Sequence, residues 1–241
     1  TIDIPRDKLH CALLHFIHEW SIPEQSLEMQ STPFYGPLLP LKFYGLYLNQ
    51  EKLPTMASFD TIQSLLQQRG ICMLKIAFLD RDGTLIHDYP DDHWQNVKEP
   101  DLLPGTIEGL SGLATLGFQF IIITNQYLIA DGIIQEEDYQ VFHTKLLNIF
   151  KQSGIHILHT YHCPHNDGDM CSCKKPKTGM VEQAMEDFPI DMASSIYCGD
   201  SPCDYLLAQR LMLPFFGIQY QGQEKDVKRC HSLMDVLRHL L

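Results

Sequence analysis

The sequence predicts an α/β protein whose core is a doubly wound parallel sheet. Two observations support this fold class. Short apolar runs, each long enough for one buried strand, alternate along residues 75–241 with segments whose apolar residues recur at helical spacing. Carboxylate, hydroxyl and amide side chains follow directly after several of these runs. Alternating strands and helices favour parallel strands joined by right-handed crossovers, and such sheets bind ligands beyond the carboxyl ends of their strands.

The first 74 residues are predicted to form a separate extension. Apolar residues recur at helical spacing between Leu9 and Trp20, and prolines punctuate the stretch that follows. A short strand is expected near Lys42–Leu48, and a second helix from an N-cap at Ser58 to Gly70. No catalytic motif occurs in this extension. An accessory lid, an oligomerisation element and the remnant of a fused upstream domain are all compatible with it.

The first strand of the core ends in two carboxylates one residue apart. Ile76–Leu79 is a buried apolar run, and Asp80, Asp82 and Gly83 follow it. A carboxylate in this place can attack phosphorus and form an aspartyl-phosphate, while a second one protonates the leaving oxygen and later activates water. Mg²⁺ prefers oxygen ligands of this kind and would offset the negative charge. The alternative is an acidic turn without a catalytic role, since Asp and Gly are common turn residues.

Five helices and four more strands are expected to complete the core. Residues 87–104, which come before the first of these elements, are expected to form a solvated acidic loop. The run at residues 118–123 is wholly apolar, which favours a strand buried on both faces. In chain order, the expected elements are the helix Ile107–Leu116, the strand Phe118–Ile123, the helix Tyr139–Phe150, the strand Ile155–Tyr161, the helix Met180–Phe188, the strand Ser195–Cys198, the helix Leu206–Leu211, the strand Phe215–Ile218 and the helix Leu233–Leu241.

Polar residues after two of these strands are candidates for the same site as Asp80. Thr124 and Asn125 follow the second strand, and their hydroxyl and amide groups are suited to hold phosphate oxygens. Asp200 and Asp204 follow the fourth strand in the sequence G-D-S-P-C-D. Because the carboxyl ends of parallel strands meet at one edge, Asp200 is the natural third side of a Mg²⁺ site.

Residues 163–173, C-P-H-N-D-G-D-M-C-S-C, carry four potential ligands for zinc. Cys163, His165, Cys171 and Cys173 match the four-coordinate structural zinc sites of proteins. With all four positions filled by side chains, the ion is expected to be structural and not hydrolytic. The alternative is a loop in which reduced cysteines are close by chance.

Three lysines follow the cysteine cluster in the sequence K-K-P-K. Lys175, between Cys173 and Pro176, is the best candidate to direct an ammonium group at a phosphoryl group. Lys177 is expected to be a surface residue.

Composition narrows the class of partner. The formal net charge of −12 disfavours a nucleic-acid partner, whose binding depends on Lys and Arg. No apolar run approaches a membrane span, and the first residues lack the apolar core of a signal peptide. Clustered cysteine ligands indicate a reducing compartment. We therefore expect a cytoplasmic protein that does not bind a membrane. Its expected partner is a small phosphorylated metabolite, and the sequence leaves the oligomeric state open.

Four motifs and the zinc loop together resemble a known superfamily. D-R-D-G-T, I-T-N-Q, K-K-P and G-D-x-x-x-D occur in the order typical of the haloacid dehalogenase superfamily of phosphatases. With C-P-H…C-x-C, the chain is similar to the zinc-bearing branch that includes D-glycero-D-manno-heptose 1,7-bisphosphate phosphatase and histidinol-phosphate phosphatase. The resemblance covers residues 75–220 and implies a Rossmann-like core with a minimal cap.

The resemblance also implies a role for each motif residue. Asp80 would be the nucleophile and Asp82 the general acid/base. Lys175 would contact the transferred phosphoryl group, with Thr124 and Asn125 as its other phosphate-binding residues. The Mg²⁺ ligands would be Asp80, Asp82, Asp200 and Asp204.

Substrate choice is harder to predict from the same motifs. I-A-x-G after T-N-Q resembles the heptose enzyme, whereas the five residues between His165 and Cys171 resemble the histidinol enzyme. Lys174 stands where the heptose family has an Arg that could grip a phosphate group bidentately, and Asp131 and Tyr127-Leu128 also depart from its pattern.

The expected function is a Mg²⁺-dependent phosphomonoesterase that acts through an aspartyl-phosphate. Its expected substrate is a small phosphorylated sugar or polyol, most like D-glycero-D-manno-heptose 1,7-bisphosphate. Histidinol phosphate is the alternative substrate. A non-catalytic binding domain that uses residues 1–74 is the alternative of another class, and nucleic-acid end processing is supported by fold resemblance alone.

Overall fold

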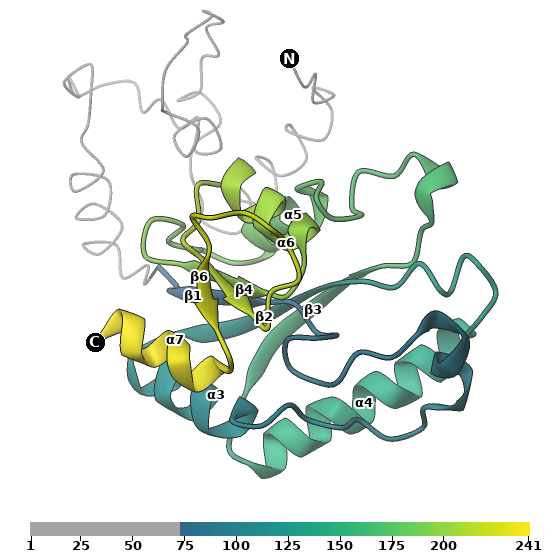
Figure 1. The fold of residues 1–241 in the computed structure, drawn as a ribbon, viewed down its shortest axis with the longest axis horizontal. Helices are drawn as coiled ribbons and strands as arrows, with labels where there is room; N and C mark the ends of the chain where they lie inside the picture. Colours follow the sequence, from purple (N-terminus) through teal and green to yellow (C-terminus); the bar gives the residue numbers. More distant parts are fainter. Residues whose placement is uncertain (1–72) are drawn as a thin grey trace, which may run out of the picture. The chain divides into compact units, whose positions relative to one another are not determined.

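A six-stranded parallel sheet forms the middle layer of the described part of the protein (Figure 1). The structure, a computed structural model, describes residues 73–241, so the helices and strand expected within residues 1–72 lie outside the described residues. The strand order is β3-β2-β1-β4-β5-β6, and every pairing is parallel. The strands are β1 Ile76–Leu79, β2 Gln119–Asn125, β3 Ile157–Cys163, β4 Ile196–Gly199, β5 Phe215–Ile218 and β6 Lys228–Cys230.

Helices cover both faces of the sheet, as a doubly wound fold requires (Figure 1). The helices are α3 Thr106–Thr115, α4 Glu136–Gln152, α5 Gly179–Asp187, α6 Pro202–Arg210 and α7 Leu233–Leu240, with 3-10 turns η3 Asp91–Asn96 and η4 Asp167–Asp169. Side chains of α3, α4 and α7 pack in one hydrophobic cluster with Ala77 and Leu79 of β1. Side chains of α5 and α6 pack in the other cluster with Ile76 and Phe78. Alternate residues of one strand therefore point to opposite faces of the sheet.

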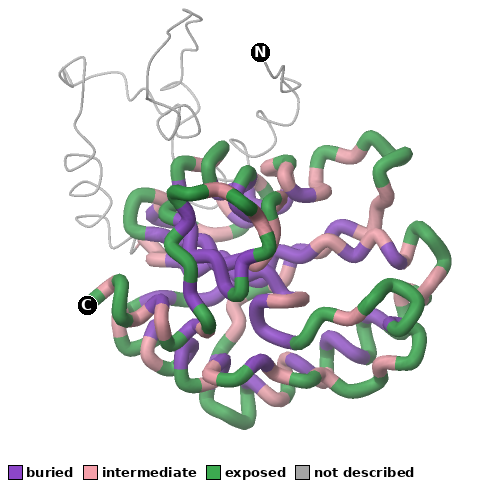
Figure 2. The backbone as a smooth tube through the Cα atoms, viewed as in Figure 1, coloured by how far each residue is buried: buried purple, intermediate pink, exposed green. Residues whose placement is uncertain are grey.

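Burial follows this layering. The central strands are the most buried part of the described chain, and the loops around them are the most exposed (Figure 2). Residues 76–79 are fully buried, and so are residues 121–123 of β2. Among residues 73–241, only η3 and η4 stand outside the sheet and its covering helices, so a cap in this part of the chain is minimal at most. No helix in the described part is both long enough and apolar enough to cross a membrane.

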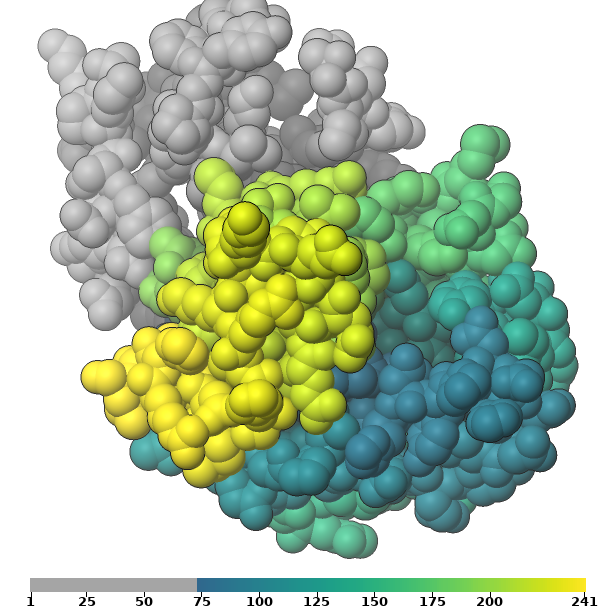
Figure 3. Space-filling model, viewed as in Figure 1, coloured from purple at the N-terminus to yellow at the C-terminus, as the bar shows by residue number. Residues whose placement is uncertain are grey.

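Two glycines of α3 let α7 pack closely on that helix. A Cβ at Gly109 would lie 2.4 Å from the Leu233 side chain, and one at Gly112 would lie 2.2 Å from Leu237. Larger side chains at these positions would hold α7 away from α3. In the space-filling view, the α7 segment (yellow) lies against the blue surface of the earlier chain (Figure 3). The expected helix Leu233–Leu241 is thus present, and it closes the core beside α3.

The structure corrects the expected elements at several boundaries. β2 continues through Thr124 and Asn125 although they are polar, because their backbone stays paired with His162 and Cys163 of β3. β3 accordingly ends at Cys163, two residues beyond the expected end. β6 was not predicted, since its Lys228 and Arg229 are exposed and charged, which is a common feature of edge strands.

The loop expected to be solvated at residues 87–104 is partly structured. It contains η3, whose Trp94 is only 7% exposed and contacts Phe142 of α4 edge-on, with ring centroids 5.7 Å apart. One apolar side chain therefore anchors this acidic segment to the core.

Candidate active site

Three carboxylates converge at the carboxyl edge of the sheet. Asp80 follows β1, Asp200 follows β4, and Asp204 lies in the first turn of α6. Because β1 and β4 are paired neighbours, their ends lie side by side, and one carboxylate oxygen of each residue lies within 4.8 Å of the others. The close approach depends on glycine. A Cβ at Gly83, where φ is +78°, would lie 2.3 Å from Asp200 Oδ2, so a larger residue would displace that carboxylate.

Lys175 lies among these carboxylates. Its Nζ atom is 2.5 Å from Asp80 Oδ1, 2.7 Å from Asp204 Oδ1 and 3.0 Å from the Ile123 carbonyl oxygen. The residue is 5% exposed. Burial would lower the pKa of Lys175, but the charges of Asp204 and Asp80 outweigh burial and raise it, so the ammonium stays charged. One positive charge thus faces three carboxylates.

The excess of negative charge raises the pKa of two of the carboxyl groups. Burial raises the pKa of Asp80 well above its ordinary value, Lys175 opposes this, and Asp204, Asp200 and Asp82 add to it. Burial and the Asp204 charge also raise the pKa of Asp200 to about 7. A cation in this position would relieve the repulsion, and clustered carboxylate oxygens are the donor set that Mg²⁺ prefers.

Asp204 is fully buried and has its carboxylate occupied by protein donors. Oδ1 accepts hydrogen bonds from Lys175 Nζ and, at 3.0 Å, from the Tyr197 hydroxyl. Oδ2 accepts from the backbone N–H of Ser201 at 3.3 Å and from its hydroxyl at 2.5 Å. These contacts anchor Lys175. That Asp204 is also a Mg²⁺ ligand stays a prediction, since one of its oxygens lies within 4.8 Å of those of Asp80 and Asp200.

Asp82 does not join the three carboxylates. Its Oδ1 and Oδ2 accept hydrogen bonds from Nε and Nη2 of the preceding residue, Arg81, both at 2.8 Å. Gln126 Nε2 donates a further bond to Oδ2 at 2.8 Å. The prediction that the Asp82 side chain is a Mg²⁺ ligand is therefore not supported, because this carboxylate is turned toward Arg81 and Gln126.

The polar residues at the end of β2 make two different kinds of contact. The Asn125 amide pairs with the backbone of Lys175 and so does not lie free to hold phosphate. Thr124 is 1% exposed, and its hydroxyl accepts a hydrogen bond from Gln126 Nε2 at 3.0 Å. Gln126 was not predicted as a site residue. Gln126 directly follows the predicted residues Thr124 and Asn125 in the sequence, and this position was the one sign that it could belong to the site.

Arg81 was also missed, although it lies between the two predicted aspartates. It is 1% exposed, and its guanidinium lies 5.2–5.6 Å from the ring centroids of Trp94, Tyr139 and Phe142. Burial would lower its pKa, but the Asp82 charge and hydrogen bonds outweigh burial and raise it. An isolated Arg in a D-x-D motif gives no sign of being buried. Only the packing of η3 and α4 shows it.

Lys174 lies in a different environment from its neighbour Lys175. Its Nζ atom is 2.7 Å from Asp167 Oδ1 and 4.8 Å from the centroid of the Tyr127 ring. These three residues line an open pocket together with Asp131, Asn166 and Gly168. The pocket therefore holds one lysine and two carboxylates.

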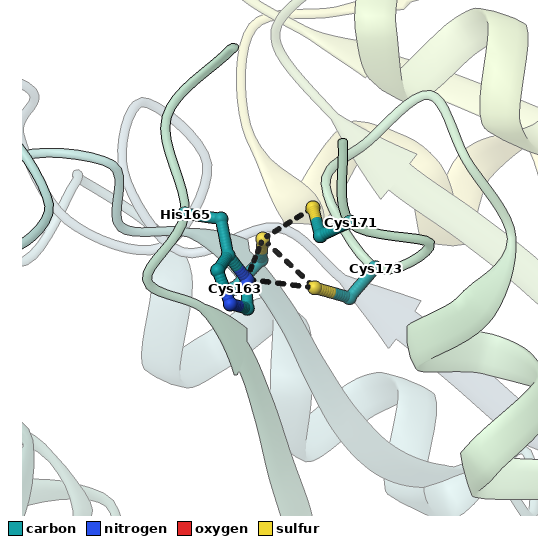
Figure 4. Close-up of side chains that lie close together, drawn as sticks. All are labelled: Cys163, His165, Cys171 and Cys173. Carbon is teal, nitrogen blue, oxygen red and sulfur yellow. Dashed lines mark hydrogen bonds between the residues drawn. The ribbon is translucent and has the colours of Figure 1, made fainter. Parts of the chain in front are cut away.

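The four predicted zinc ligands lie together (Figure 4). Cys163 Sγ is 3.0 Å from Cys173 Sγ and 3.7 Å from Cys171 Sγ, and His165 Nδ1 is 3.2 Å from Cys173 Sγ. A tetrahedral site with zinc–sulfur bonds of about 2.3 Å places its sulfur atoms roughly 3.8 Å apart, so the side chains fit a zinc ion after small adjustments. Burial raises the pKa of Cys163 and Cys173, whereas hydrogen bonds from Lys174 and Cys173 outweigh burial and lower the pKa of Cys171 to about 7.

Comparison with known families decides the class of the protein. The family model of polynucleotide kinase 3 phosphatase matches residues 75–235, more than half of the chain. The chain belongs to this family. It is a phosphatase of the haloacid dehalogenase superfamily, so the predicted resemblance and enzyme class are confirmed.

Two curated relatives and one solved structure are similar to the chain. The D-glycero-alpha-D-manno-heptose-1,7-bisphosphate 7-phosphatase of Photorhabdus laumondii is 37% identical over 148 residues, which are 58% of this chain and 80% of that protein. The histidine biosynthesis bifunctional protein HisB of Blochmanniella floridana is 35% identical over 162 residues, 66% of this chain but only 44% of that protein. The crystal structure of D,D-heptose 1,7-bisphosphate phosphatase from B. bronchiseptica, complexed with magnesium and phosphate, aligns with 25% identity and a TM-score of 0.61 over 69% of this chain and 98% of that one.

Proposed function

We propose that this phosphatase is a Mg²⁺-dependent phosphomonoesterase that acts through an aspartyl-phosphate on a small phosphorylated sugar. The proposed substrate is most like D-glycero-D-manno-heptose 1,7-bisphosphate. The observation that carries the proposal is the contact of Lys175 with Asp80 at 2.5 Å, beside Asp200, at the carboxyl edge of the sheet. The heptose phosphatase that is 37% identical over 148 residues supports the choice of substrate.

In the first step, the Asp80 carboxylate attacks phosphorus. The new bond joins an Asp80 oxygen to phosphorus, and the bond from phosphorus to the sugar oxygen breaks. Asp82 gives its proton to that leaving oxygen, whose electron pair came from the broken bond. The Lys175 ammonium offsets the negative charge of the phosphoryl oxygens, and the Thr124 hydroxyl donates a hydrogen bond that orients them. In the second step, Asp82 takes a proton from a water molecule whose oxygen attacks phosphorus. The bond from phosphorus to the Asp80 oxygen breaks, which releases phosphate and restores the Asp80 carboxylate.

The carboxylates of Asp80 and Asp200 would hold the Mg²⁺ ion. When bound, it supplies positive charge that offsets the repulsion between carboxylates and phosphate. Asp204, occupied by four protein donors, holds Lys175 in place.

The zinc ion is proposed to be structural. Its four ligands would be Cys163, His165, Cys171 and Cys173, which leaves no open coordination position. The cluster joins the end of β3 to the residue two positions before Lys175. Zinc would therefore stabilise the loop that presents the catalytic lysine.

Histidinol phosphate remains a second candidate because of the pocket beside Lys174. Asp131 and Asp167 line this pocket, and Lys174 is already paired with Asp167. Carboxylates would repel a second phosphate and attract an ammonium group. The relative HisB also supports this alternative. A nucleic-acid substrate is disfavoured by the net charge of −12.

The test is to assay the protein with Mg²⁺ on heptose 1,7-bisphosphate, histidinol phosphate and a 3′-phosphorylated oligonucleotide. We expect phosphate release from the heptose substrate with the highest kcat/KM of the three, and none without Mg²⁺. A higher kcat/KM on histidinol phosphate would select the second candidate. Release from none of these or of other sugar phosphates, by a protein shown to be folded, would contradict the proposed function.

A further inference from the structure

We propose that Arg81 is a positioning residue that holds Asp82 in the orientation needed for proton transfer to the leaving oxygen. This inference rests on the proposed function, in which Asp82 is the general acid. Arg81 itself is fully buried behind Asp82 and is not expected to touch the substrate.

The contacts determine both the place and the plane of the Asp82 carboxylate. Arg81 Nε and Nη2 bind its two oxygens as a fork at 2.8 Å, and Nε2 of Gln126, the residue after β2, binds Oδ2 at 2.8 Å. A single hydrogen bond would leave the carboxylate free to rotate, whereas two parallel bonds from a planar guanidinium prevent rotation. The Asp82 side chain keeps 17% of its surface exposed, so a substrate can still reach it.

Packing makes Arg81 a rigid support. Its guanidinium is surrounded by the rings of Trp94 from η3 and of Tyr139 and Phe142 from α4. A lone charge at this depth would be costly, but the pairing with Asp82 compensates for it. Because the Arg81 side chain is 1% exposed and its fork is paired with Asp82 in the folded protein, much of the entropy of ordering it is lost in folding and not during catalysis.

The same pair helps the reaction after the proton has moved. Transfer of the Asp82 proton to the leaving oxygen leaves a carboxylate, and the charge of Arg81 stabilises that product through a charge-assisted fork. This effect matters most when the leaving group is a poor one. A sugar alkoxide must be protonated as it departs, whereas p-nitrophenolate leaves without a proton.

The decisive experiment compares leaving groups in Arg81→Lys, which keeps the charge and loses the fork. We expect kcat/KM to fall about 100-fold on a sugar phosphate and by less than about fivefold on p-nitrophenyl phosphate, since general acid catalysis typically contributes about 10²–10⁴-fold. Asp82→Asn should show the same selective loss, with a larger factor on the sugar phosphate. Equal losses on both substrates in Arg81→Lys, or no loss on either, would overturn the proposal.

Two further variants separate positioning from general stability. Phe142→Leu opens the packing around Arg81 but keeps the fork, so it should lower the melting temperature without changing the ratio of kcat/KM between the two substrates. If Arg81→Lys does not fold, Arg81→Gln decides, because its shorter, uncharged amide also lacks the two-donor fork on Asp82. A selective loss on the sugar phosphate supports the proposal, and an equal loss or none overturns it.

Failure of this inference is distinguishable from failure of the proposed function. A wild-type protein that hydrolyses neither substrate would contradict the proposed function. An active wild type, with Asp82→Asn selectively impaired and Arg81→Lys not selectively impaired, would contradict only the role of Arg81.

Discussion

Asn125 and Lys175, fifty residues apart in the chain, pair through two hydrogen bonds. The backbone N–H of Lys175 donates to Asn125 Oδ1 at 2.9 Å, and Asn125 Nδ2 donates to the Lys175 carbonyl oxygen at 3.3 Å. The side-chain amide thus binds the lysine backbone as a neighbouring strand would. Together with Asp204, it places the Lys175 ammonium beside Asp80.

The first prediction concerns the nucleophile. Asp80→Asn should abolish turnover and leave the melting temperature close to that of the wild type, because the amide keeps the side-chain volume but cannot attack phosphorus. Steady-state phosphate release and thermal unfolding measure the two effects. Residual activity above about a tenth of wild type would show that Asp80 is not the nucleophile. Asp101→Asn, which changes an exposed carboxylate outside the site, is the matched control.

The second prediction separates the two lysines. Lys175→Arg should lower kcat/KM by about 100-fold or more on every substrate, because the buried space between Asp80 and Asp204 does not admit a guanidinium. Lys174→Arg should raise kcat/KM on heptose 1,7-bisphosphate, since a fork can grip a second phosphate, and should be neutral or harmful on monophosphates.

Both lysine variants should be measured on both types of substrate, with Lys177→Arg as the control. Equal losses from Lys174→Arg and Lys175→Arg on all substrates would mean that the two roles are assigned wrongly.

The third prediction concerns zinc. Elemental analysis should find about one zinc per chain, and Cys171→Ser should lower both the zinc content and the melting temperature. Activity should fall as well, since the ligand Cys173 is two residues from Lys175. Removing Mg²⁺ alone should instead stop turnover and leave most of the thermal stability. A purified protein without zinc, whose cluster cysteines react as free thiols, would contradict this assignment.

The fourth prediction is a pH dependence of stability. Burial lowers the pKa of His143 to about 4, and the charges of Arg81 and His162 act in the same direction. Between this value and the ordinary 6.5, the unfolded chain binds a proton that the folded protein does not bind. Stability is therefore fully present above pH 6.5 and is lost as the pH falls toward 4, by roughly 3 kcal/mol if this group alone is counted.

The variant that tests this is His143→Gln, which keeps a polar group near the Thr160 hydroxyl but cannot take up the proton. Denaturant unfolding at pH 7 and pH 4.5 should show a smaller loss of stability in the variant than in the wild type. Equal losses in the two proteins would mean that other groups cause the acid sensitivity.

Patterns local in the sequence determined much of this protein. The apolar runs of β1, β2 and β5 are identifiable because buried strands must be apolar on both faces, and β5 begins and ends where predicted. The four zinc ligands were identifiable because they lie within eleven residues of one another, so that one loop can bring them together. The D-x-D motif was identifiable for the same reason, because both of its aspartates directly follow one strand, β1.

Only the tertiary structure decided which partners the polar side chains take. Asn125 and Asp204 carry the same functional groups whether they bind phosphate, metal or Lys175, and their sequence neighbours do not distinguish these uses. Arg81 is buried only because Trp94 of η3 and Phe142 of α4 close over it. The strength of a hydrogen bond or ion pair depends on distance and burial. Those quantities are set when strand order brings distant segments together at one edge of the sheet.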